Sequence, residues 1–103
     1  MSVRRQSQPW PYKAARVADQ VTAALAEVGA GARAMDKQMT AIDRMAAMGV
    51  DALRNGNILL AQQVLIDIQQ RTTTVRHTAA TILGTAGTAS AALAAARVGE
   101  YSE

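Results

Sequence analysis

Few side chains in this sequence could do chemistry, and those few are not grouped as catalysis requires. His77 is the single histidine among 103 residues, and there is no cysteine. A metal site with several imidazole or thiolate ligands therefore cannot form within one chain. Asp36 and Asp43 lie seven residues apart on one predicted helix face, but the solvated flanks of paired helices carry such residues routinely. We therefore predict no catalytic residue, no cofactor, no metal site and no enzyme activity.

The second kind of chemistry is phosphate binding, because basic residues gather at the N-terminus. The first sixteen residues carry four basic side chains and no acid, whereas the remainder carries seven basic and eight acidic ones. The candidate phosphate contacts are Arg4, Arg5, Lys13 and Arg16. With Trp10 and Tyr12 they could hold phosphates and stack a base, so a nucleic-acid-associated helical protein is the alternative function. The helical region offers no basic stripe, which argues against it.

The residues around Trp10 predict an extended tail over residues 1–11. Pro9 and Pro11 bracket the only tryptophan, and residues that precede proline are biased away from helix. Trp10 and Tyr12 could together anchor a partner protein in a groove. The other interpretation is that Trp10 folds back over the open end of the helical region.

The element that must position these groups is a reversal at residues 54–57. Asn55-Gly56 is a strong turn signal, since both residues tolerate the positive φ of a tight turn or helix C-cap. Small and apolar residues repeat at helical spacing on both sides of it. We predict an all-α fold, a long antiparallel helical hairpin over residues 12–98, with a C-terminal tail at 99–103. A break at Gly29–Gly31 would give three helices instead of two.

Both predicted helices carry a coiled-coil-like seam, in which steps of three and four residues alternate. In the first helix the seam is Ala14, Ala18, Val21, Leu25, Val28, Ala32, Met35, Met39, Ile42, Ala46, Gly49 and Leu53. In the second it is Ile58, Ala61, Leu65, Ile68, Thr72, Val75, Ala79, Ile82, Ala86, Ala89, Leu93 and Ala96. A turn centred on Asn57 pairs large with small residues across the seam, for example Gly49 with Leu65 and Ala32 with Ile82.

Apolar residues beside the turn remain outside this seam. They are Met45, Met48, Val50, Leu59, Leu60, Val64 and Ile66. Half of all residues are apolar but nearly half of these are alanine, and none is phenylalanine, so two helices alone would form a thin core. We predict a non-enzymatic structural or interaction subunit in which the leftover apolar residues form an interface. The expected partner is a second copy or another helical protein.

The sequence shows no convincing signal for export or for membrane insertion. Residues 6–12 are polar and proline-broken where a signal peptide needs an apolar core, so a cytoplasmic protein is the default expectation. The uncharged run from His77 to Ala96 is long enough to span a bilayer. Only Ile82, Leu83 and Leu93 are strongly apolar within it, so we expect the protein not to reside in a membrane.

One stretch resembles a known family of assembly proteins. Asn57-Ile-Leu-Leu-Ala-Gln-Gln63, directly after a turn, is similar to the start of the second helix in type III secretion needle and inner-rod subunits. The resemblance covers about fifteen residues, and the proline usual in that turn is absent. It implies a further alternative, a secreted or filament-forming hairpin subunit of a secretion or pilus-like system.

Overall fold

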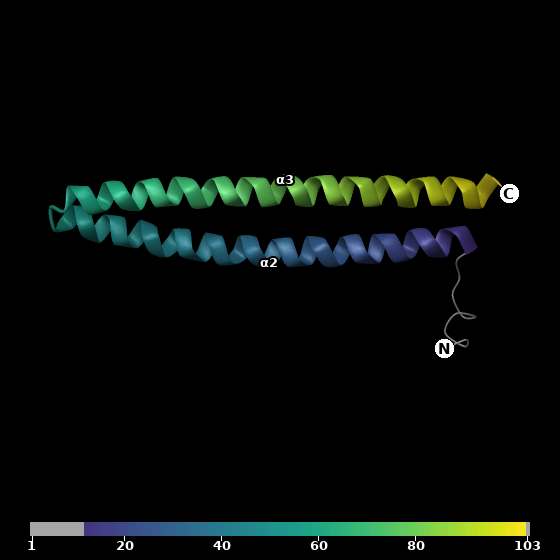
Figure 1. The fold of residues 1–103 in the computed structure, drawn as a ribbon, viewed down its shortest axis with the longest axis horizontal. Helices are drawn as coiled ribbons and strands as arrows, with labels where there is room; N and C mark the ends of the chain where they lie inside the picture. Colours follow the sequence, from purple (N-terminus) through teal and green to yellow (C-terminus); the bar gives the residue numbers. More distant parts are fainter. Residues whose placement is uncertain (1–11, 103) are drawn as a thin grey trace, which may run out of the picture. The chain divides into compact units, whose positions relative to one another are not determined.

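The computed structural model describes the backbone of residues 12–102 and the side chains of residues 15–97. Two long α-helices, α2 from Tyr12 to Arg54 and α3 from Ile58 to Ser102, are joined by one turn (Figure 1). They form an antiparallel hairpin, which confirms the predicted all-α fold.

The helix bounds differ from the prediction at one end. The first helix is continuous through Gly29–Gly31, so the chain has two helices in the described region and not three. α3 continues to Ser102, past the predicted end at residue 98, so the proposed C-terminal tail is wrong for residues 99–102. The predicted N-terminal tail, residues 1–11, lies outside the described residues.

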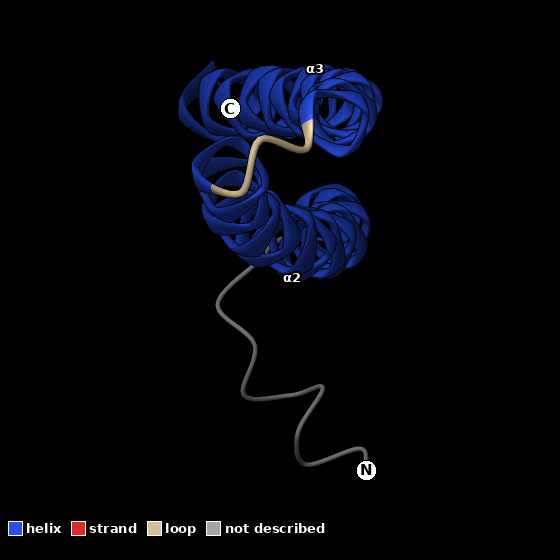
Figure 2. Ribbon diagram, turned by 90° about the vertical axis from the view of Figure 1, so that its left-hand side faces the viewer, coloured by secondary structure: helices blue, strands red, loops and turns tan. Residues whose placement is uncertain are grey.

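The turn at Asn55–Asn57 is a helix C-cap that leads directly into a helix N-cap (Figure 2). Gly56 has a φ of 74°, and its N–H donates to the Leu53 carbonyl while the Asn57 N–H donates to the Ala52 carbonyl. These two bonds are the Schellman pattern, which needs a left-handed residue at the glycine position. The Asn57 side-chain oxygen then accepts from the Leu60 N–H at 3.1 Å and caps α3. The chain thus reverses direction between Arg54 and Ile58.

The chain divides into two compact parts, residues 29–82 and residues 1–28 with 83–103. The part that contains the turn holds most of the buried apolar residues, namely Met45, Ala52, Ala61 and Val64. In the described residues of the other part, Val21 is the one buried apolar residue. Each part is thus a pair of helical segments around a thin core.

The observed seam matches the predicted one at every seventh residue and, apart from Ala18 and Leu93, differs from it in between. Val21, Val28, Met35, Ile42 and Gly49 are buried or half-buried in α2, and so are Ala61, Ile68, Val75, Ile82, Ala89 and Ala96 in α3. The predicted seam residues Leu25, Met39, Leu53, Ile58 and Leu65 are exposed. At Leu53 and Leu65 the residue one position earlier is buried instead, namely Ala52 in α2 and Val64 in α3, and Met45 is buried in place of Ala46.

Glycine explains why this alternative seam is used near the turn. A Cβ on Gly49 would lie 3.5 Å from the Val64 side chain, and one on Gly31 would lie 3.1 Å from Ile82. Each glycine therefore receives a branched side chain from α3, which allows close packing of the helices. Gly84 and Gly87 have no such neighbour, since nothing in the described residues comes within 4 Å of a Cβ at either position.

Candidate self-association surface at the turn

Large apolar side chains are exposed around the turn on both helices, within residues 29–82. We call this group the turn-end surface. Its members are Met48, Val50, Leu53, Ile58, Leu59, Leu60, Leu65 and Ile66. Ile58 and Leu59 are 73% and 67% exposed, respectively, as part of the first turn of α3. Several large apolar side chains exposed in one region mark an interaction site more often than singly scattered apolar residues do.

The seven residues predicted to form an interface fall into two groups. Met48, Val50, Leu59, Leu60 and Ile66 are exposed and belong to the turn-end surface. Met45 and Val64 do not, because they are buried in the core between α2 and α3, with exposures of 9% and 5%. The shifted seam is the physical reason that these two side chains lie inside the hairpin and not on the turn-end surface.

Sequence reasoning missed Leu53, Ile58 and Leu65 as surface residues. It placed all three inside because large apolar residues at seam spacing are normally core. They are at least 58% exposed. The signal that could have found them is the pair Gly49 and Val64, which pack together when the seam passes through residue 64 and not through residue 65.

An open groove of about 500 Å³ runs along one side of the turn-end surface. Met48, Leu60 and Ile66 line its apolar portion, and Met45 and Val64 form part of its floor. Its remaining lining is polar and consists of Gln63, Asp67, Gln70 and Arg71. We call it the turn-end groove. It combines apolar contact with one acid and one base, the composition of a protein-binding surface with a polar rim.

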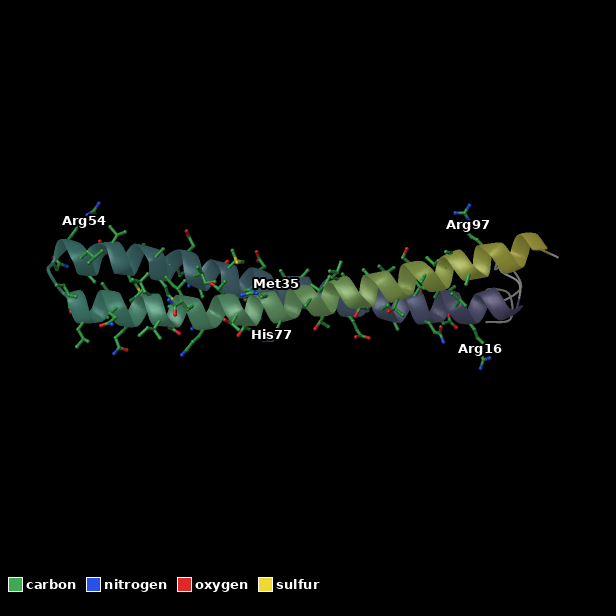
Figure 3. The ribbon with its side chains drawn as sticks, turned by 90° about the horizontal axis from the view of Figure 1, so that it is seen from above. Arg16, Met35, Arg54, His77 and Arg97 are labelled. Atoms are coloured by element: carbon green, nitrogen blue, oxygen red, sulfur yellow. The ribbon has the colours of Figure 1, made fainter. Side chains whose placement is uncertain are left out.

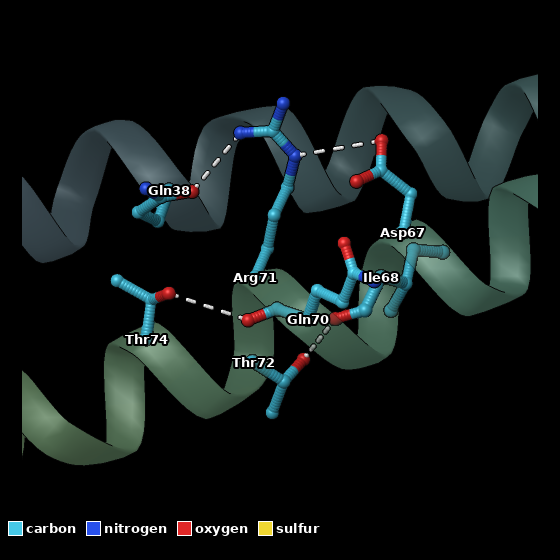
Figure 4. A network of polar contacts seen from close by, with 7 residues as sticks. All are labelled: Gln38, Asp67, Ile68, Gln70, Arg71, Thr72 and Thr74. Atoms are coloured by element: carbon cyan, nitrogen blue, oxygen red, sulfur yellow. Dashed lines mark hydrogen bonds and ion pairs between the residues drawn. The ribbon is translucent and has the colours of Figure 1, made fainter.

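Arg71 is the centre of the polar network in this groove (Figure 4). Its Nη1 donates to the Gln38 side-chain oxygen at 3.0 Å, which links α3 to α2. Its Nε lies 3.8 Å from the Asp67 carboxylate, too far for a hydrogen bond. Within the described residues, Nε is the buried side-chain polar atom that has no hydrogen-bond partner. Arg71 thus occupies a seam position while part of its donor capacity stays unused.

The threonines that follow Arg71 bond to their own helix. Thr72, Thr73 and Thr74 donate from their hydroxyls to the carbonyls four residues earlier, at 2.8, 3.0 and 3.3 Å. A threonine whose hydroxyl is satisfied in this way presents mainly its methyl group to a neighbour. The exposed surface of α3 beyond the groove is therefore less polar than its composition suggests.

The candidate phosphate contacts are not assembled into a site by the described structure. Arg4, Arg5 and the proposed anchor Trp10 lie outside the described residues. Tyr12 and Lys13 belong to the first turn of α2, where the side chains are not described. Arg16 is exposed and, like Arg54 and Arg97, points away from the helices (Figure 3).

Other features of the described residues bear on function less directly. Residues 12–102 contain no group of three His, Asp or Glu side chains that could hold a metal ion. One helix, over Ile58–Arg97, is long and apolar enough to cross a membrane by length and composition alone, with a mean hydropathy of 1.4 in its best window. In comparisons with protein-family models, curated proteins and solved structures, nothing matches this chain.

Proposed function

We propose that this protein is a non-enzymatic structural subunit that self-associates through the turn-end surface. The observation that carries the proposal is the set of exposed large apolar side chains on both helices beside the turn. No helix of the same chain covers them in the described structure, because α2 and α3 already use their inward faces on each other.

The energetics of the hairpin support a need for further helices. A two-helix core of alanine, glycine and a few larger residues removes little apolar surface from water, at roughly 25 cal/mol per Å². Even Val64, among its best buried residues, stays 5% exposed. A standard protein interface takes about 800 Å² from each partner, which is about a tenth of the 8050 Å² accessible surface of this chain. Association of that size would add a second core of larger side chains.

The proposal is tested by one substitution on the turn-end surface and one matched substitution away from it. Leu60→Asp places a charge in the apolar portion of the groove, whereas Leu83→Asp places the same charge on a 76% exposed residue outside the turn-containing part. Sedimentation analysis should show that Leu60→Asp raises the dissociation constant by about 100-fold, as expected for an interface centre. Leu83→Asp should leave it unchanged.

Helicity is the control for both variants. Leu60 is 41% exposed, so a charge there should leave the circular dichroism of the hairpin close to that of the natural chain. If Leu60→Asp self-associates as tightly as the natural chain, the turn-end surface is not the interface. If Leu83→Asp has the larger effect, the interface lies in the other part of the molecule.

A further inference from the structure

We infer that the occupant of the turn-end groove is a second copy of this chain, whose α3 runs antiparallel to the first so that Asp67 of each copy pairs with Arg71 of the other. The inference rests on the proposed function, because it names the partner and the orientation of the self-association. It follows from the charges and hydrogen bonds of the groove.

The first reason is the unused binding capacity of Arg71. One of its donors is bonded to Gln38, while the buried Nε has no hydrogen-bond partner in the described residues. The nearest carboxylate, Asp67 of the same helix, stays 3.8 Å away and is half exposed. The Nε itself is covered, so a carboxylate from a neighbouring molecule would bind at the exposed part of the Arg71 guanidinium, whose side chain is 39% exposed. Charge-assisted bonds of this kind are about twice as strong as neutral ones.

The second reason is symmetry. A two-fold interface uses the same patch on both copies, so each contact of residue i with residue j occurs twice. The groove contains one acid and one base, four residues apart on α3. If the two α3 helices ran parallel about the two-fold axis, Asp67 would face Asp67 and Arg71 would face Arg71, which is repulsive. If they run antiparallel, both opposite-charge pairs form.

Charge-reversal variants test the pairing, because each variant carries charges of a single sign at positions 67 and 71. Asp67→Arg gives two bases and Arg71→Glu gives two acids, so each variant alone should show a dissociation constant raised by at least about ten-fold. An equimolar mixture should recover to within about three-fold of the natural chain, because every pair in the mixed dimer is again opposite in charge. A chain with both substitutions should self-associate like the natural one.

Matched controls keep the result specific. Asp43→Arg and Arg76→Asp reverse charges at exposed positions that do not line the groove, and both should leave the dissociation constant unchanged. If Arg71→Glu lowers the helicity, Asp67→Arg is compared with Asp67→Asn, and only the arginine should cause repulsion and the larger loss of affinity.

Three outcomes separate this inference from the proposed function. Weak self-association of each single variant, together with restored affinity in their mixture, supports the reciprocal pairing. A natural chain that stays monomeric overturns the proposed function and this inference together. The pairing alone is overturned if the natural chain self-associates and Asp67→Arg does not change its affinity. It is also overturned if the mixture of the two variants does not recover the affinity of the natural chain.

Discussion

The turn-containing part of the molecule, residues 29–82, differs from the other part in both its core and its surface. Among residues 15–97, whose side chains the structure describes, it holds four of the five buried apolar residues and nine of the eleven exposed large apolar ones. The other part holds Val21 inside and Leu25 and Leu83 outside. Large apolar side chains are thus concentrated near the turn beyond what a pair of helices can bury, which is the composition expected of a subunit that completes its core with a neighbour.

The variants with the largest expected difference in stability place one charge in each part of the molecule. Val64→Asp puts a carboxylate into the packed core against Gly49 and should lower the free energy of unfolding by about 3–5 kcal/mol. Leu83→Asp, at an exposed position, should change it by less than about 0.5 kcal/mol. Urea unfolding followed by circular dichroism at one protein concentration measures both. Equal effects would show that the two parts are packed alike.

Alanine substitutions at two glycines, one in each part, test the same comparison. Alanine at Gly84 meets open space and should raise the free energy of unfolding by about 0.5–1 kcal/mol, because alanine is the better helix former. Alanine at Gly31 gains the same propensity but presses on Ile82 at 3.1 Å, so crowding that costs about 1–3 kcal/mol should cancel or outweigh the gain. Thermal unfolding of the two variants side by side gives the difference. A Gly31→Ala variant as stable as Gly84→Ala would contradict the close approach.

Substitutions of Gly56 and Asn57 at the turn should each have an effect of about 1 kcal/mol. Gly56→Ala forces a side chain into the left-handed region and should cost about 1 kcal/mol. Asn57→Ala removes the cap that accepts from the Leu60 N–H and should cost about 1 kcal/mol as well. Asn55→Ala is the control and should leave the free energy of unfolding nearly unchanged, because the positive φ belongs to its neighbour Gly56. The same urea titration measures all three, and a neutral Asn57→Ala would argue against the cap.

Much of the fold could be predicted from the sequence because its strongest signals are local. The reversal at Asn55-Gly56 depends on residues that are adjacent in the chain, and so does the start of α3 at Ile58. Helical periodicity placed every seventh seam residue correctly, as Val28, Met35 and Ile82 show. It could not choose between residues 64 and 65 for the intervening position, because both are apolar and both satisfy the spacing.

The remainder could not be predicted because it depends on which residues meet across the hairpin. Val64 is inside because Gly49 leaves room for it, and that choice moves Leu65 to the surface. Arg71 would not be expected at a seam position, since a guanidinium is costly to bury without partners. Its bond to Gln38 is a contact between residues 33 apart, which single-sequence periodicity does not report.

The mass of the natural chain in solution tests self-association most directly. Size-exclusion chromatography with light scattering, run over a dilution series, should show a mass of at least twice the 10.8 kDa chain at micromolar concentration, falling toward the monomer on dilution. A monomeric mass at every concentration, with a sharp and concentration-independent unfolding transition, would contradict the proposal.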